Sequence, residues 1–214
     1  MNPDQRGRGI GTALAEKAIA YIREVGVETI RLEAVEEVVP LYERLGFRQE
    51  FASLRYQGRM TATKSESSKA RVSLMRPGDL VELVTFDSDH FGAGRTRVLQ
   101  TQVEGNPLHS YVARREEILG YIMPRKTEIG YWIGPWVSSD VAASEELLIA
   151  AVNSFDESNP MLRFGFPSPN GEMQKLMRKY GIPFRGRSIR MVLGKDSFGG
   201  NPERIYGIAG PEKG

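Results

Sequence analysis

The fold of this chain is decided near its start by the stretch Arg6-Gly7-Arg8-Gly9-Ile10-Gly11-Thr12. From Ile10 to Val25 apolar residues recur every third or fourth position, which predicts a helix that ends at Gly26. The first amides of a helix have no partner within the helix, and the helix dipole adds positive charge there. Glycines let an anion approach the backbone closely. The stretch therefore predicts a phosphate-binding nest where a loop meets the first helix.

Known phosphate loops match this stretch only in part. The dinucleotide fingerprint requires G-x-G-x-x-G, whereas Gly7, Gly9 and Gly11 give G-x-G-x-G, and the Gly-Lys-Ser/Thr of a P-loop is absent. The periodic helix that follows argues against an Arg- and Gly-rich nucleic-acid tail. A lead-in whose glycines only permit a turn remains the alternative interpretation.

Helices and strands alternate in the segment that follows the loop. Residues 29–34 place apolar side chains at every second position, which predicts a strand. Residues 38–45 predict a short helix with Pro40 in its first turns and Gly46 at its end, and residues 47–57 predict a second strand. This order of elements favours an α/β fold.

A polar stretch rich in Ser, Thr and Lys, residues 59–69, predicts a surface linker. The patterns beyond it predict a longer series of helices and strands. These are a strand at 72–75, an interrupted helical stretch at 80–99, strands at 110–114, 118–123 and 129–137, a helix at 141–154, a strand at 161–166, a helix at 172–180, and strands at 188–193 and 204–209.

Two groups of side chains in this later part are weaker candidates for a site. Asp87, Asp89 and His90 are close enough in sequence to hold a metal ion or an amine, or they are simply polar groups at a helix end. Trp132 and Trp136 either line a pocket or pack their rings in the core.

Composition excludes several classes of protein. Hydrophobic residues make up 40% of the 214 residues and charged residues 26%, as in an ordinary globular protein. No apolar run is long enough for a membrane span, and the first residues lack the apolar core of a secretory signal, so we expect a cytoplasmic protein without a membrane partner. The net charge of +2 does not favour a nucleic-acid partner. With no cysteine and two histidines, we expect no metal.

A second motif follows the glycine loop, Leu41-Tyr42-Glu43-Arg44-Leu45-Gly46-Phe47. The loop resembles the acyl-CoA loop of the GNAT superfamily of N-acetyltransferases, whose pattern R/Q-x-x-G-x-G/A is matched by Arg6, Gly9 and Gly11. The second motif resembles the Leu-Tyr-x-x-x-Gly-Phe element on that family's next helix. The resemblance implies the GNAT acyl-CoA N-acyltransferase fold, an α/β fold with a mixed sheet flanked by helices.

Other stretches are similar to a subgroup in which a GNAT domain precedes a second, degenerate GNAT-like domain. These stretches are Arg31-Leu32-Glu33-Ala34, Phe91-Gly92-Ala93-Gly94-Arg95, Ile133-Gly134-Pro135-Trp136 and Arg190-Met191-Val192-Leu193-Gly194. The similarity implies that residues 1–58 are the C-terminal half of a GNAT domain, that 59–69 are a linker, and that 70–214 are a complete, degenerate GNAT-like domain.

The resemblance also implies a reaction and its residues. Acetyl-CoA would be the donor and co-substrate, and a small-molecule or peptide amine would attack it directly. The residues that would bind the CoA pyrophosphate are Arg6, Gly7, Arg8, Gly9, Ile10, Gly11 and Thr12. Tyr42 would protonate the departing thiolate, although a tyrosine that only packs beside Leu41 and Leu45 is the alternative. A non-catalytic CoA-binding module, or a structural module that forms a homodimer through exposed strand edges, is the alternative function.

The chain departs from the family pattern in two places. The strand that should precede Arg6 is missing, so the sequence predicts that Met1 is an internal position of a longer chain. The stretch equivalent to the phosphate loop in the later domain, residues 135–140, has no glycine and ends in Asp140. We therefore expect the later domain not to bind CoA through this loop.

Overall fold

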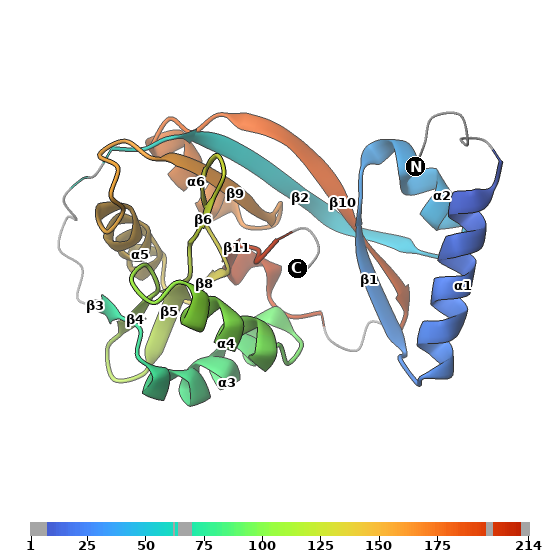
Figure 1. Cartoon of the computed structure of the whole chain (residues 1–214), viewed down its shortest axis with the longest axis horizontal. Helices are drawn as coiled ribbons and strands as arrows, with labels where there is room; N and C mark the ends of the chain where they lie inside the picture. The colour runs from blue at the N-terminus through green and yellow to red at the C-terminus, as the bar shows by residue number, and fades with distance from the viewer. Residues whose placement is uncertain (1–7, 62, 64–69, 196–198, 211–214) are drawn as a thin grey trace. The chain divides into compact units, whose positions relative to one another are not determined.

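A computed structural model describes residues 8–61, 63, 70–195 and 199–210 of the chain. The chain forms two compact units, Met1–Phe51 with Ser188–Ser197, and Ala52–Arg187 with Phe198–Gly214. Helices lie against sheets within these units (Figure 1), and one of the sheets combines antiparallel pairs with a parallel pair, so the predicted α/β fold class is confirmed.

The first unit is a small sheet with two helices. Its elements are α1 (Ile10–Glu24), β1 (Thr29–Ala34), α2 (Val39–Arg44), the start of β2 (Arg48–Arg59) and the end of β10 (Phe184–Gly194), with a 3-10 turn at Glu36–Val38. The strand order is β1-β10-β2, and β10 pairs antiparallel with β1 from Thr29 opposite Gly194 to Ala34 opposite Ile189. Strand β10, from late in the chain, therefore completes the sheet of the first unit.

Alternation along β1 separates an apolar face from a charged face. Ile30, Leu32 and Ala34 pack in one cluster with Phe47 and with residues of both helices. Helix α1 contributes Ile19 to this cluster but has no fully buried residue. One stripe of α1 thus covers the sheet, and the rest of the helix remains at the surface.

The opposite face of the same sheet carries an ion cluster. Arg31 Nε lies 3.1 Å from Glu50 Oε1, and Arg190 Nε lies 3.3 Å from Glu50 Oε2. Ser188 Oγ donates a hydrogen bond of 2.7 Å to Glu33. Burial lowers the pKa of the Arg190 guanidinium, and the negative charges of Glu50 and Glu33 oppose that shift. The cluster ties together all three strands of the unit.

The second unit has two sheets. Its helices are α3 (Leu80–Phe91), α4 (Thr96–Gly105), α5 (Val141–Asn153) and α6 (Gly171–Lys179), with 3-10 turns at Pro77–Asp79 and Pro202–Arg204. Its strands are β3 (Arg71–Leu74), β4 (Tyr111–Arg114), β5 (Ile118–Ile122), β6 (Arg125–Thr127), β7 (Gly130–Trp132), β8 (Trp136–Ser138), β9 (Met161–Pro167) and β11 (Ile205–Gly207). One sheet has the order β11-β8-β5-β4-β3, and the other continues from the end of β2 as β2-β9-β7-β6.

The first of these sheets is covered by helices on both faces. Val112 and Tyr121 point to the side of α3 and α4, where they meet Leu83. Their neighbours Ala113 and Ile122 point to the side of α5. This alternation therefore gives the second unit two apolar clusters, one on each face of the sheet.

The predicted single strand at 129–137 is wrong. Residues 130–132 form β7 in one sheet and residues 136–138 form β8 in the other, with Gly134 between them. Gly134 has φ 155°, and a Cβ there would lie 2.2 Å from the carbonyl oxygen of Ile208. Close backbone packing therefore breaks the aromatic run, which the alternation of its side chains did not predict.

Other boundaries also differ from the prediction. Strand β6 was not predicted, and β10 begins at Phe184 rather than at residue 188. Of the predicted linker 59–69, Arg59 ends β2, Met60 is buried, and residues 62 and 64–69 lie outside the described residues. The first unit ends at Phe51 and includes residues 188–197, which the predicted division after residue 58 had assigned to the second segment.

Replacing Gly134 with Ala should destabilise the protein by about 2 kcal/mol or more, because the new Cβ combines an unfavourable φ with a backbone overlap. Urea unfolding measures this change. Gly105 at the end of α4 is the control, since a Cβ there meets nothing within 4 Å. Gly105→Ala should be neutral or stabilising, and equal effects of the two changes would contradict the account.

Candidate functional site

The predicted phosphate nest lies at the first turn of α1. Gly9 is the N-cap with φ 74° and ψ 0°, a left-handed conformation that favours glycine. The first turn of α1 contains no acidic residue, and no side chain among the residues that the structure describes caps it. A Cβ built on Gly9 would meet none of the described atoms within 4 Å.

The other residues predicted for the nest are placed as follows. Ile10, Gly11 and Thr12 form the first turn of α1, and Arg8 lies exposed just before it. Arg6 and Gly7 lie outside the described residues. The structure therefore confirms the helix start, and binding of a phosphate there stays a prediction.

Tyr42, the predicted acid, belongs to α2 and is half-buried. Its ring meets that of Phe47 edge-on, with centroids 5.6 Å apart. It packs against the same apolar cluster as Ile19 and Leu45. The structure thus gives Tyr42 the packing contacts that the alternative interpretation expects, and its role as an acid stays a prediction.

Helix α5 in the second unit begins differently. Asp140 is its N-cap, and Asp140 Oδ1 accepts a hydrogen bond of 2.8 Å from the Ala143 amide. Asp140 Oδ2 lies 3.1 Å from Arg115, and the Ser139 amide donates to Leu119. A carboxylate already occupies this helix start, so the residues present do not fit a pyrophosphate.

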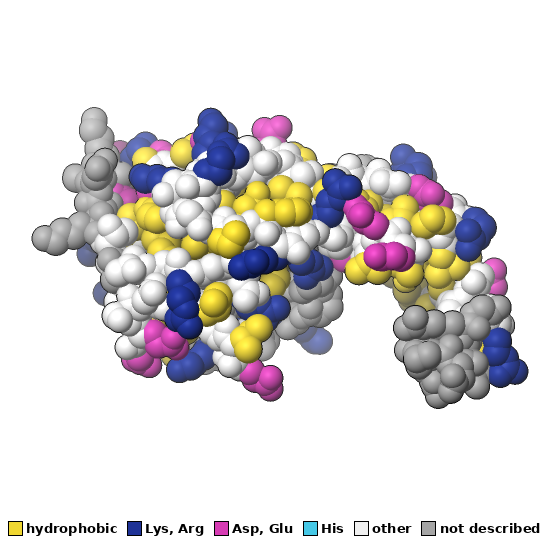
Figure 2. All heavy atoms as spheres, turned by 90° about the horizontal axis from the view of Figure 1, so that it is seen from above, with side chains coloured by type: hydrophobic (Ala, Val, Ile, Leu, Met, Phe, Trp, Pro, Cys, Tyr) yellow, Lys and Arg dark blue, Asp and Glu magenta, His cyan; other side chains and the backbone are white. Residues whose placement is uncertain are grey.

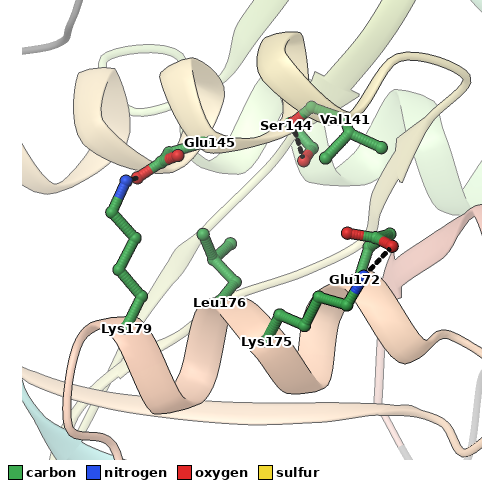
Figure 3. A pocket seen from close by; sticks show the side chains of 7 residues that line it. All are labelled: Val141, Ser144, Glu145, Glu172, Lys175, Leu176 and Lys179. Atoms are coloured by element: carbon green, nitrogen blue, oxygen red, sulfur yellow. Dashed lines mark hydrogen bonds and ion pairs between the residues drawn. The ribbon is translucent and has the colours of Figure 1, made fainter.

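A cleft of about 220 Å³ separates α5 from α6 (Figure 3). Leu176 points into it, and Glu145 of α5 meets Lys179 of α6 at 2.5 Å. Burial acts to raise the pKa of Glu145, but hydrogen bonds from Lys179 and Tyr180 hold it below its usual value. Charges of opposite sign thus pair across the cleft.

Asp87, a candidate for a metal or amine site, is instead part of a buried cluster. Arg95 donates hydrogen bonds of 2.9 Å to both of its carboxylate oxygens, and Tyr121 also donates to it. The Arg95 guanidinium lies 3.7 Å from the centre of the Phe91 ring. Burial raises the pKa of Tyr121, while Asp87 and Tyr121 outweigh burial and raise that of Arg95.

This cluster corrects the sequence interpretation of Asp87. From the sequence, Asp87 was grouped with Asp89 and His90. No sequence pattern linked it to Arg95 or Tyr121, which lie further along the chain. His90 lies 2.8 Å from the carbonyl oxygen of Phe86, one turn back in α3. Among the described residues, no group of three or more His, Cys, Asp or Glu side chains could hold a metal ion.

The two tryptophans belong to the core, as the alternative interpretation expected. Trp136 is fully buried and Trp132 nearly so. Trp132 Nε1 donates a hydrogen bond of 2.9 Å to the carbonyl oxygen of Ile208.

In the parts of the chain that the structure describes, no helix is long and apolar enough to cross a bilayer.

The acetyltransferase (GNAT) domain family matches residues 83–207, which is more than half of the chain. The chain belongs to the GNAT family of acetyltransferases. A second family, described as the acetyltransferase (GNAT) family, matches residues 1–47, which include the glycine loop and Tyr42. Both parts of the chain therefore have counterparts in this family.

Relatives and solved structures agree with this assignment. An uncharacterised N-acetyltransferase of Bacillus subtilis, YitH, is 27% identical over 178 residues, which are 81% of this chain and 60% of the relative. A crystal structure of a protein from Pyrococcus horikoshii matches with a TM-score of 0.75 and 23% identity, covering 98% of this chain and 68% of that one. A GCN5-related N-acetyltransferase from Sphaerobacter thermophilus matches with a TM-score of 0.62 and 17% identity, over 91% and 70%. GNAT structures thus share the fold, and the chain spans about three fifths of the Bacillus relative. The division into a truncated and a degenerate domain stays a prediction.

Removing one partner of the Asp87–Arg95 pair should be costly. Asp87→Leu and Arg95→Met should each destabilise the protein by about 3–5 kcal/mol, because each leaves a buried charge without its partner. The double change should cost less than the sum, since it removes both charges. Urea unfolding of the four proteins measures the coupling, with Lys175→Ala in the exposed pair with Glu172 as a control within about 0.5 kcal/mol of the unmodified chain. Additive effects would contradict the assignment of a coupled pair.

Proposed function

We propose that this enzyme transfers an acetyl group from acetyl-CoA to a small-molecule or peptide amine, and that the start of α1 binds the CoA pyrophosphate. The observation that carries the proposal is the helix start at Gly9, which has no acidic residue in its first turn and no cap from any side chain in the described part of the chain. The GNAT family match over residues 1–47 supports the same place in the chain.

The residues at this helix start suit a pyrophosphate chemically. The amides of Ile10, Gly11 and Thr12 belong to the first turn, where helix amides lack partners within the helix. The helix dipole places partial positive charge at the same point, and Arg8 adds a full charge beside it. Gly9 and Gly11 leave room for the phosphate oxygens to reach the backbone.

Acetyl transfer needs an amine nucleophile and an acid for the leaving group. The neutral amine nitrogen attacks the thioester carbonyl carbon and the carbon–sulfur bond breaks. The nitrogen gives up a proton to become an amide, and the departing thiolate takes one to become the CoA thiol. The Tyr42 hydroxyl is our candidate for that proton donor, because a phenol can donate a proton or a hydrogen bond. Its ring is held by Phe47 and the apolar cluster, which would fix the direction of the hydroxyl.

The proposal assigns acetyl-CoA to the first unit and not to the second. At α5 the cap carboxylate of Asp140 stands where a phosphate would bind, and the Ala143 amide is already used. The cleft between α5 and α6 is lined by paired charges, Glu145 with Lys179 and Glu172 with Lys175. We therefore expect one acetyl-CoA per chain.

Gly11→Asp should weaken acetyl-CoA binding about a hundredfold or more, because it puts a negative charge and a side chain at the second helical position of α1. Isothermal titration calorimetry measures the affinity. Ala142→Asp is the matched control, because Ala142 holds the second helical position of α5 and is exposed. Equal losses from both changes, or no binding of acetyl-CoA by the unmodified chain at millimolar concentration, would contradict the proposal.

Tyr42→Phe should lower kcat by about a hundredfold and leave acetyl-CoA affinity nearly unchanged, because it removes only the hydroxyl and keeps the ring against Phe47. Product formation with a panel of amines measures turnover. A variant as active as the unmodified enzyme would show that Tyr42 only packs. Acetyl-CoA binding without product from any amine would favour the alternative, a non-catalytic module.

A further inference from the structure

Four neighbouring strands of the second unit carry one row of side chains across a sheet. Gln57 of β2 lies directly opposite Arg163 of β9. Trp132 of β7 is level with Arg163 in the parallel pair, and Arg125 of β6 lies opposite Trp132. Residues paired in this way point to the same face of a sheet, while the alternate residues of these strands point into the core. The row therefore runs across the face that is turned away from the core.

This face of the sheet is positively charged. Besides Arg163 and Arg125 it carries Arg55 and Arg59, which stand two residues before and two residues after Gln57 on β2. Among the described strand residues that the pairing registers place on this face, none is Asp or Glu. Figure 2 shows that Lys and Arg side chains also reach the surface of the second unit elsewhere, among hydrophobic ones.

The sheet of the first unit balances its arginines differently. There Glu50 lies 3.1 Å from Arg31 and 3.3 Å from Arg190, so a carboxylate stands beside each guanidinium. The arginine face of the second unit receives no such carboxylate from its own strands. Guanidinium groups that share a face repel one another, and an anion bound among them would relieve the repulsion.

Trp132 gathers two of these arginines. The guanidinium carbons of Arg125 and Arg163 lie 5.6 Å and 5.7 Å from the centre of its ring. The ring is fixed by its hydrogen bond to Ile208 and by close packing over Gly165, where a Cβ would lie 3.1 Å from Trp132 Cη2. A cation–π contact uses the face of a guanidinium and none of its five N–H donors.

The donors of Arg163 and Gln57 are available to a ligand. In the part of the chain that the structure describes, neither side chain makes a hydrogen bond or an ion pair, and both are half-buried. Residues directly opposite each other have Cβ atoms about 5 Å apart, so both side chains can reach one oxyanion. Arg55 lies opposite Gly165 and is thus the diagonal neighbour of Arg163, about 7–8 Å away.

We propose that Arg163, Gln57 and Arg55 bind the phosphate group of a small molecule. Arg163 donates two parallel hydrogen bonds to two phosphate oxygens, the Gln57 amide donates a third, and Arg55 adds a second positive charge. A phosphate monoester carries nearly two negative charges at neutral pH and balances two guanidiniums, whereas a carboxylate balances one. All three residues belong to the second unit, whereas the nest proposed for acetyl-CoA belongs to the first.

The tryptophans make binding visible. The chain has two, and Trp136 is fully buried, whereas the ring of Trp132 contacts Arg163. Titration with inorganic phosphate at constant ionic strength and about pH 7.5 should change the tryptophan emission and saturate in the millimolar range. Acetate at the same ionic strength should give no such change, and Trp132→Phe should remove the response to phosphate.

Arg163→Gln should weaken phosphate binding about tenfold or more, because it removes the bidentate donor and its charge. Arg97→Gln is the matched control, because it removes the same charge from an exposed position of α4 and should change the affinity less than about twofold. Gln57→Met keeps the charge and about the same volume but removes the amide, so we expect a smaller loss of about threefold.

Arg163→Lys serves if the glutamine variant does not fold. It keeps the charge but loses the bidentate geometry, so phosphate binding should weaken about threefold or more. An unchanged affinity of Arg163→Lys or of Gln57→Met would contradict the assigned donors. No saturable response to phosphate, an equal response to acetate, or equal losses in Arg163→Gln and Arg97→Gln would overturn the proposal.

The 3′-phosphate of CoA is a second source of the same chemical group. Calorimetric titration of Arg163→Gln with acetyl-CoA separates the two sources, and we expect the affinity of the unmodified chain. A loss as large as that of Gly11→Asp would show that Arg163 binds part of acetyl-CoA, and would overturn the proposal of a separate phosphate ligand.

Discussion

The first unit depends on the antiparallel ladder between β1 and the end of β10. A segment of 51 residues buries little surface alone, and β10 adds the buried side chains Met191 and Leu193 to its apolar cluster. It also adds Arg190 to the ion cluster on the opposite face. Because the paired residues lie far apart in the sequence, this sheet can close only after β10 has been synthesised. The first unit is thus built from two distant segments of the chain.

Two helix starts in this chain differ in how their first amides are used. At α1 a glycine in the left-handed conformation leaves the first amides without a side-chain cap. At α5 the carboxylate of Asp140 accepts from the Ala143 amide, which stabilises the helix and blocks an anion by the same contact. Helix stability and anion binding compete for the same amides. The fold alone therefore does not predict a ligand, and the proposed function depends on the capping residue at each helix start.

The local elements could be predicted from the sequence. The bounds of β1 were predicted as observed, and α1 begins at the predicted residue, because both patterns depend on near neighbours. The position of Gly9 before the first turn followed from the same pattern. Placement of the end of β10 beside β1 could not be predicted, since no local pattern records which distant strand completes a sheet. The prediction of one continuous strand across Gly134 failed for a similar reason, because the break depends on the backbone of Ile208.

Buried charges limit the arrangements that each unit can adopt. In the second unit Asp87, Arg95 and Tyr121 join α3, the start of α4 and β5. In the first unit Arg31, Glu50 and Arg190 join three strands.

Removing such charges from water costs about as much as their attraction returns, so the clusters add little net stability. The clusters instead disfavour alternative arrangements of the strands and helices, because an arrangement that separates the partners leaves a charge without its partner.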